Sequence, residues 1–310
     1  MKSQLKAVVH PIHLVVGIVF LAFISISAAV AQTSDEAILV LEASSAVVPR
    51  VSYSSDGRLL LSSQLFSKAP FQAILWDAET GEIVRALEPH EQGVGDSDFS
   101  SDGALAATVD VAGNVHLWDV ESGESTLLIE NAHRGAIYGV AFSSDDTRIV
   151  TGGVDKLAKV WDTTTGELLL TLKGHRDYIG IVAYAPDDSL IATSSGDTDV
   201  ILWDAVTGEN LRVLSDHTGY LWDVAFSPDG LQLVTAGGPD RTARLWEVET
   251  GEVVAELEHP RDVQGAAWSF DGQYILTGSA DKNAYLWDVA TGEIIQTFTG
   301  HTDKVNGVAL

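Results

Sequence analysis

A tryptophan followed by an acidic residue recurs at nearly constant spacing through most of this chain. The intervals between successive tryptophans of these pairs are 42, 43, 42, 43 and 41 residues. Such a period indicates a repeat array, because each copy is a small unit that cannot bury its apolar faces without its neighbours. The pairs are Trp76-Asp77, Trp118-Asp119, Trp161-Asp162, Trp203-Asp204, Trp246-Glu247 and Trp287-Asp288.

Two further marks recur in the same phase. A Thr-Gly-Glu or Ser-Gly-Glu triplet follows every tryptophan pair, and a histidine precedes all pairs except the first. The first unit carries Ser44 at the histidine position and has surplus residues within Gln64–Phe71, so it is degenerate. Three marks in fixed phase define six units. The histidines are His90, His133, His175, His217 and His259, and His301 continues the same spacing after the last pair.

Each complete unit contains four short runs rich in β-branched and aromatic residues. Turn residues separate these runs every 8–12 positions or so, which is typical of an all-β fold. The inner runs do not alternate cleanly between apolar and polar residues, which indicates strands covered on both faces. In the third unit the runs are Ile137–Phe142, Arg148–Thr151, Ala158–Trp161 and Leu168–Leu172.

These units resemble the WD-repeat (WD40) β-propeller family over residues 37–310. The family pattern is a histidine before the first strand, Ser or Thr on the second, Asp in the following turn and Trp on the third. In the second unit His90, Thr108 and Trp118 match, but Ala112 stands at the Asp position. The complete sets are His133, Thr151, Asp155 and Trp161; His175, Thr193, Asp197 and Trp203; His217, Thr235, Asp240 and Trp246; and His259, Thr277, Asp281 and Trp287.

The repeated histidines are predicted to be structural. A buried indole N–H needs an acceptor, and a buried imidazole needs partners for both nitrogens. The Thr hydroxyl can accept from Trp and donate to His, while Asp holds the other imidazole nitrogen. His116 lies outside this phase, two residues before Trp118, and we expect an exposed strand residue.

The ends of the repeat region suggest a shared unit. Ala37–Glu42 resembles an outer strand, and residues 304–310 resemble the start of a first strand. In propellers of this family the two termini commonly share one blade. We therefore expect six full four-stranded repeats plus a partial seventh, in a C-terminally truncated seven-bladed ring; the alternative is a six-bladed ring.

The first 31 residues differ from the rest. Lys2 and Lys6 precede the uncharged run Leu14–Ala31, which ends in Ala-Val-Ala before Gln32. This pattern predicts a signal peptide over residues 1–31, followed by the repeat domain over 32–310 in a secreted or periplasmic, bacterial-type protein. The alternative is a membrane anchor over residues 14–31, since 18 apolar residues could just span a bilayer.

Composition excludes several kinds of chemistry. The chain contains no Cys, so disulfides, thiolate metal sites and Cys nucleophiles are excluded. Its net charge of −26 favours solubility and repels nucleic acid and anionic lipid. Asp96-Ser97-Asp98 and Asp197-Thr198-Asp199 resemble fragments of a calcium loop but lack its Gly and closing Glu. We expect no metal, no cofactor and no catalytic residues.

The resemblance implies a non-catalytic platform for protein partners; the alternative is an enzyme or ligand-binding propeller that uses the central channel. In WD-repeat propellers the residues three and five after the repeat His point out of the narrower face. The aromatic residues at these positions fall in three successive units, so they would form one arc, unless they pack between blades. The predicted partner-binding residues are Tyr138, Tyr178, Tyr220 and Trp222, with Arg134 and Arg176 after the histidines.

Overall fold

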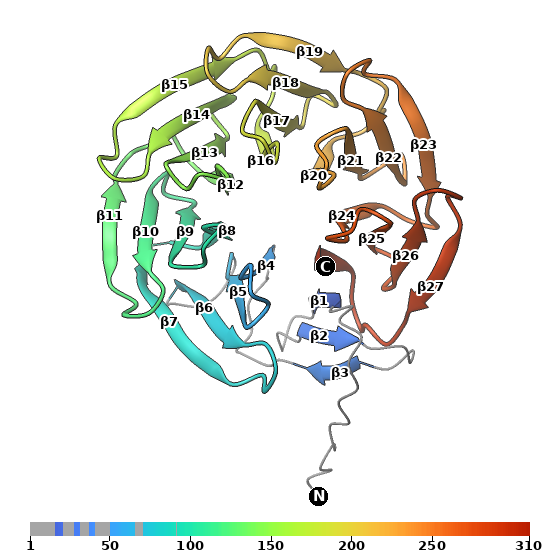
Figure 1. The fold of residues 1–310 in the computed structure, drawn as a ribbon, viewed down its shortest axis with the longest axis horizontal. Helices are drawn as coiled ribbons and strands as arrows, with labels where there is room; N and C mark the ends of the chain where they lie inside the picture. Colours follow the sequence, from blue (N-terminus) through green and yellow to red (C-terminus); the bar gives the residue numbers. More distant parts are fainter. Residues whose placement is uncertain (1–15, 21–27, 32–36, 41–49, 66–70, 91) are drawn as a thin grey trace, which may run out of the picture.

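The computed structural model describes residues 16–20, 28–31, 37–40, 50–65, 71–90 and 92–310. Within these ranges it contains 28 strands and no helix. The strands form four-stranded sheets arranged radially around a central axis, with one strand of each sheet near the axis and the others progressively farther out (Figure 1). The predicted all-β propeller architecture is confirmed.

Six sheets, called blades 1 to 6, each consist of four consecutive antiparallel strands. Each blade corresponds to one sequence unit. From the centre outward, the strands are β4 (Val51–Tyr53), β5 (Leu59–Ser63), β6 (Phe71–Asp77) and β7 (Ile83–His90) in blade 1; β8 (Val94–Phe99), β9 (Leu105–Asp110), β10 (Val115–Asp119) and β11 (Ser125–Ile129) in blade 2; β12 (Ile137–Phe142), β13 (Arg148–Gly153), β14 (Leu157–Asp162) and β15 (Leu168–Lys173) in blade 3; β16 (Ile179–Tyr184), β17 (Leu190–Ser195), β18 (Val200–Asp204) and β19 (Asn210–Leu214) in blade 4; β20 (Leu221–Phe226), β21 (Gln232–Gly237), β22 (Thr242–Glu247) and β23 (Val253–Glu258) in blade 5; and β24 (Val263–Trp268), β25 (Tyr274–Ser279), β26 (Ala284–Asp288) and β27 (Ile294–Phe298) in blade 6.

The remaining sheet joins the two ends of the described chain. Its innermost strand is β28 (Val305–Ala309), followed by β1 (Val16–Phe20), β2 (Ala28–Ala31) and β3 (Ala37–Val40). Its inner and outer strands therefore come from the two segments expected to share a unit. The two middle positions, expected to be empty, hold β1 and β2, whose residues lie within the predicted signal peptide. The basic start and the Gln32 side of the predicted cleavage site lie outside the described residues.

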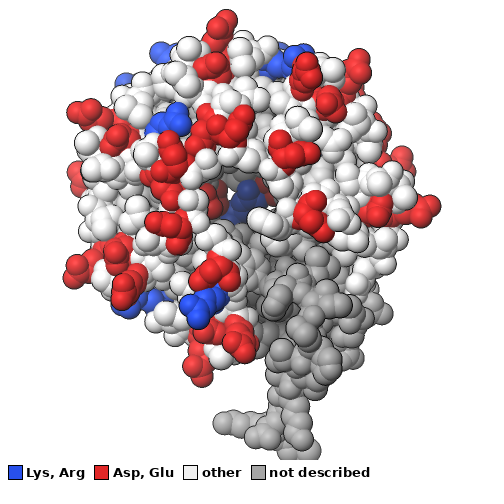
Figure 2. Space-filling view, viewed as in Figure 1, with Lys and Arg blue, Asp and Glu red and all other residues white. Residues whose placement is uncertain are grey.

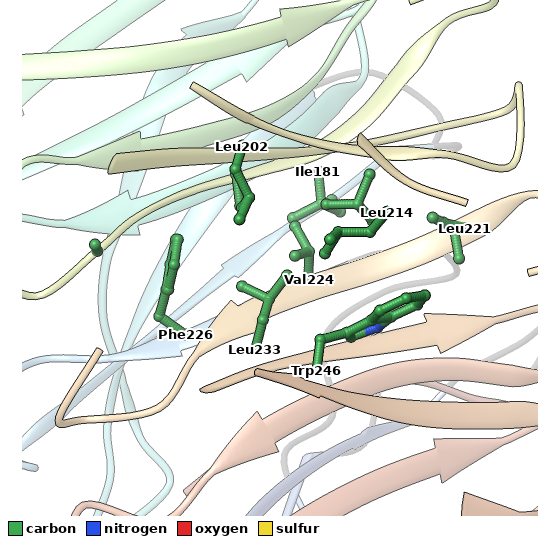
Figure 3. Close-up of a cluster of buried hydrophobic side chains, with 11 residues drawn as sticks. Ile181, Leu202, Leu214, Leu221, Val224, Phe226, Leu233 and Trp246 are labelled. Carbon is green, nitrogen blue, oxygen red and sulfur yellow. The ribbon is translucent and has the colours of Figure 1, made fainter. Parts of the chain in front are cut away.

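The core lies between neighbouring blades. Ile181, Leu202 and Leu214 of blade 4 pack against Leu221, Val224, Phe226, Leu233 and Trp246 of blade 5 (Figure 3). Equivalent buried clusters lie between blades 2 and 3, 3 and 4, and 5 and 6. The inner strands are apolar on both faces because each sheet is covered on both sides by its neighbours.

Buried aspartates also connect the innermost strands of neighbouring blades. Asp96 of β8 accepts a hydrogen bond from the backbone N–H of Val140 in β12, at 3.0 Å. Asp223 of β20 accepts one from the N–H of Ala266 in β24, also at 3.0 Å. Each carboxylate therefore satisfies a backbone donor of the next blade, which fixes the two inner strands relative to each other.

Candidate functional site

Three blades contain the expected chain of hydrogen bonds. In blade 3, Trp161 Nε1 donates to Thr151 Oγ1 at 2.9 Å, and His133 contacts Thr151 through Nε2 and Asp155 through Nδ1, both at 2.8 Å. Because the imidazole uses both nitrogens within its own blade, it is unavailable for catalysis. The same contacts join His175, Thr193, Asp197 and Trp203 in blade 4, and His217, Thr235, Asp240 and Trp246 in blade 5.

Blade 6 differs from the prediction. His259 Nε2 contacts Thr277 and Trp287 donates to the same hydroxyl, as expected. However, His259 Nδ1 lies 2.9 Å from the Leu257 carbonyl oxygen, and Asp281 instead accepts a hydrogen bond from the Tyr285 hydroxyl at 2.5 Å. The assignment of Asp281 as the partner of His259 is therefore wrong, because the Asp281 carboxylate is hydrogen-bonded to the Tyr285 hydroxyl instead.

Blade 2 contradicts the expectation for His116. His90 and Trp118 share Thr108, each at 2.8 Å. His116 is buried rather than exposed, and its ring is stacked on Trp118 with a centroid distance of 5.5 Å and an interplanar angle of 10°. The strand position that we expected to face solvent therefore faces a neighbouring ring.

The predicted binding aromatics lie together at one end of the innermost strands. Tyr138 and Tyr178 are half-buried, and their rings meet edge to face with 6.4 Å between the ring centroids. The rings of Tyr220 and Trp222 also meet edge to face, with 5.0 Å between the centroids. Burial raises the pKa of Tyr178, and neighbouring Asp177, Tyr220 and Tyr138 raise it further, which places the two pairs within electrostatic reach. We call these four residues the aromatic patch.

The patch is neither core nor fully solvated. Tyr220 is 36% exposed and Trp222 38% exposed. The rings lie directly over the turns of their own blades: a Cβ atom added to Gly196 would come within 2.5 Å of Tyr178, and one added to Gly238 within 2.8 Å of both Tyr220 and Trp222. These turns must carry glycine for the rings to adopt this position, so Tyr178, Tyr220 and Trp222 lie directly against the backbone of the turns.

The two arginines beside the patch differ in their partners. Arg134 is exposed, and its backbone N–H donates to Asp155 at 3.1 Å. The side chain of Arg176 is 73% exposed, and its guanidinium pairs with Asp199 at 2.7 Å. An exposed ion pair of this kind contributes little stability. Arg176 can exchange this partner for one on another molecule, at the cost of breaking the pair.

The central channel contains a charged group that sequence reasoning missed. Arg50, immediately before β4, contacts Asp223 of blade 5 at 2.5 Å and Asp96 of blade 2 at 3.6 Å. We call these three residues the channel clamp. Figure 2 shows basic atoms inside the central opening. The repeat pattern could have indicated the two aspartates. Asp96 and Asp223 stand six residues after the repeat His, a position at which three other units carry glycine.

Burial dominates the electrostatics of Asp96 in the clamp and of nearby Asp98. Burial raises the pKa of Asp96 to about 7, although Arg50 and two backbone N–H groups oppose the rise. It also raises the pKa of Asp98 to about 6. Asp98 bonds the N–H of Phe142 in the next blade. Asp96 and Asp98, which resemble part of a calcium loop in sequence, instead accept hydrogen bonds from backbone amides, and Asp96 also pairs with Arg50. No metal-binding cluster of His, Asp and Glu occurs in the described ranges.

The surface is mainly acidic. Figure 2 shows Asp and Glu side chains distributed around one face of the ring and fewer Lys and Arg side chains among them. This distribution agrees with the net charge of −26. Among the described residues no helix is long and apolar enough to span a membrane. The acidic surface favours partners that carry positive charge.

Comparisons with known proteins identify relatives that share the repeat. A family model described as IFT122 first beta-propeller matches residues 136–310, and one described as WD domain, G-beta repeat matches residues 81–119. The chain is 30% identical over 126 residues to the WD repeat domain-containing protein 83 homolog of Dictyostelium discoideum. This match covers 41% of this chain and 37% of that protein. It is 34% identical over 121 residues to the guanine nucleotide-binding protein subunit beta-like protein of Encephalitozoon cuniculi, over 38% and 35% of the two chains.

The matches thus span little more than a third of the length of these relatives. A third relative, the serine-threonine kinase receptor-associated protein of Dictyostelium discoideum, is 32% identical over 108 residues, 35% of each chain. All three relatives are eukaryotic, so they give no support to the bacterial-type origin expected from the sequence.

Proposed function

Because the chain belongs to the WD-repeat β-propeller family, we propose that it is a non-catalytic platform that binds a protein partner through the aromatic patch. Propellers of this family generally mediate protein–protein interactions. The observation that carries the proposal is the position of four aromatic rings from three successive blades at the surface. Tyr and Trp are enriched in interface hot spots, because they offer large, rigid contact area at low entropic cost.

The charges around the patch favour a partner with a mixed rim. Arg134 is exposed and can pair with an acidic residue of the partner. Asp177, next to Tyr178, is exposed and can pair with a basic one. Such rim charges affect the association rate more than the affinity, whereas the rings supply most of the binding free energy.

The rival function, an enzyme or small-ligand site in the channel, receives less support. The acids at the channel are held by Arg50 and by backbone N–H groups of the next blade. A catalytic carboxylate needs access to substrate, and these side chains are already saturated with internal partners. The clamp therefore suits a structural role.

Residues 1–31 are proposed to direct export to a secreted or periplasmic location. Their basic start, apolar run and Ala-Val-Ala end support this assignment. N-terminal sequencing of the exported protein is expected to begin at Gln32, and an intact Met1 in the membrane fraction would favour the anchor instead.

The central test is Trp222→Ala. We expect loss of the partner, at a cost above about 2 kcal/mol, because the indole is the largest exposed ring of the patch. Wild type and variant are used in parallel as bait in the native fraction, and partner yield and melting temperature are measured for each. Phe270→Ala is the matched control, since Phe270 is 96% exposed at the opposite end of an innermost strand. A large fall in melting temperature with unchanged partner yield would show that Trp222 is a core residue.

A further inference from the structure

The strand position two residues before the repeat tryptophan accommodates a cation in two blades. In blade 3 it is Lys159, whose ammonium lies 5.7 Å from the centre of the Trp161 ring and donates to the carbonyl of Ala132. In blade 5 it is Arg244, whose guanidinium lies 3.2 Å from Glu256. The protein therefore supplies its own cation at this position, paired with a backbone carbonyl in blade 3 and with an outer-strand carboxylate in blade 5.

In blade 2 the same position holds His116, and a pocket opens beside it. The imidazole is shorter than a Lys or Arg side chain and lies flat against Trp118 instead of extending outward. The space left has a volume of about 440 Å³, within the range of small-ligand sites. Its walls include Asp110, Asn114, His116, Trp118, Leu128 and Glu130.

The pocket contains a buried polar atom without a partner. The side chain of His116 is 10% exposed, and its Nε2 has no hydrogen-bond partner among the described residues. Asp110 Oδ2 is 3.8 Å away, beyond hydrogen-bonding distance. A buried nitrogen left without a partner costs free energy. When the neutral imidazole carries its proton on Nδ1, Nε2 is an acceptor, so a ligand donor placed between Nε2 and the Asp110 carboxylate would be stabilised.

The charge of the pocket is negative. Burial tends to raise the pKa of Asp110, but His116 and two hydrogen bonds from Asn114 outweigh it and lower the pKa below its usual value. Asp110 is therefore ionised at neutral pH. Glu130 stands exposed at the rim and adds a second carboxylate.

We propose that this blade-2 pocket binds an organic cation: a guanidinium or ammonium group at the end of an apolar stem, as in an arginine or lysine side chain of a partner. The cation donates to His116 Nε2 and Asp110 Oδ2, and Leu128 packs against the stem. In blades 3 and 5 the cation at this position belongs to the protein itself, as the side chain of Lys159 or Arg244. In blade 2 the cation would come from another molecule. Because the chain carries a net charge of −26, it also attracts such ligands over a distance.

The first experiment compares n-butylguanidinium with its uncharged isostere n-butylurea, titrated into the full chain and followed by the NMR signals of the His116 ring and the Trp118 indole. We expect a saturable shift with the guanidinium and at least tenfold weaker binding of the urea. Equal responses to both compounds would overturn the proposal, because charge recognition is its basis.

The second experiment refills the pocket. His116→Arg places a guanidinium at the strand position that Arg244 occupies in blade 5, so we expect it to fill the pocket and to weaken n-butylguanidinium binding at least tenfold, while the melting temperature stays the same or rises. Asp110→Asn is expected to weaken binding several-fold, and Glu167→Gln, an exposed charge elsewhere, to leave it unchanged. Unaltered binding by His116→Arg would show that the cation binds elsewhere.

A third comparison distinguishes the source of the cation. The peptide acetyl-Gly-Arg-Gly-amide presents the same group on a backbone, as a protein partner does. Binding of the peptide as tight as that of n-butylguanidinium supports a partner side chain. Binding of the free cation alone supports the same pocket chemistry with a small organic cation as the ligand.

Discussion

At the scale of single residues, burial lowers the pKa of the repeated histidines His133 and His259. Burial lowers the pKa of His133 even though Asp155 opposes this effect. In blade 6 the carboxylate is bonded to Tyr285 instead, and burial lowers the pKa of His259 to about 4, with the Leu257 carbonyl offsetting only part of it. The rings of His133 and His259 are therefore neutral at neutral pH.

We expect His259 to make folding less favourable in acid. Its pKa is about 4 in the folded chain and about 6.5 when unfolded. The unfolded state therefore binds the proton first, and stability that is fully present above pH 6.5 is lost as the pH falls towards 4. The loss for His259 alone is about 3 kcal/mol.

The measurement is the free energy of unfolding at pH 7 and pH 4.5 for wild type and His259→Asn. Asp96 and Asp98 act in the opposite direction, because their raised pKa values add stability as the pH falls. Only the difference between wild type and variant isolates His259. The same pH dependence in both proteins would contradict the assignment.

At the scale of the blade, the Trp–Thr–His–Asp chain connects the third strand to the second and to the segment that enters the blade. In blade 4, Trp203 donates to Thr193, which contacts His175, which contacts Asp197. In blade 1 the chain is short: Trp76 donates to Ser62 at 2.8 Å, and the first unit has neither a repeat histidine nor a turn aspartate of its own. The indole N–H of Trp203 is therefore part of a network with three other side chains, whereas that of Trp76 bonds only Ser62.

Trp203→Phe should destabilise the protein by about 1–3 kcal/mol, because it removes the indole donor from a buried network. Trp76→Phe should cost less, since only the Ser62 hydroxyl loses a partner. Both tryptophans are almost fully buried, so the loss of packing is matched. Urea unfolding of the two variants tests this, and equal losses would argue against network cooperation.

At the scale of the whole molecule, the channel clamp joins blades that are distant in sequence. Arg50, directly before β4 of blade 1, contacts Asp223 of blade 5, 173 residues later in the sequence, and also Asp96 of blade 2. The two aspartates in turn hold backbone amides of blades 3 and 6. One side chain thus connects five of the blades through buried charges.

Arg50→Met should destabilise the fold by about 3–5 kcal/mol, because it leaves buried carboxylates without their counter-charge. Adding Asp223→Asn to this variant should recover part of the loss, since the second change removes one unpaired charge. Guanidinium unfolding of wild type, single and double variants gives the coupling. A double variant less stable than Arg50→Met by the full cost of Asp223→Asn alone would exclude coupling between the two.

The sequence by itself determined the six units, their four strands and the residues of the hydrogen-bonded chains in blades 3, 4 and 5. It could do so because these marks recur at a fixed spacing, so each unit supports the reading of the others. It also placed the aromatic positions in three successive units.

Only the tertiary structure decided the contacts that differ between units. Asp281 bonds Tyr285 instead of His259, His116 is buried against Trp118, and Arg50 reaches across the channel to Asp223. Each of these contacts depends on the distance between side chains from separate strands or blades. The same holds for the sheet that β28 shares with β1, β2 and β3. Repeat spacing fixes where a residue stands in its unit, but closure of the ring determines which other side chain it meets.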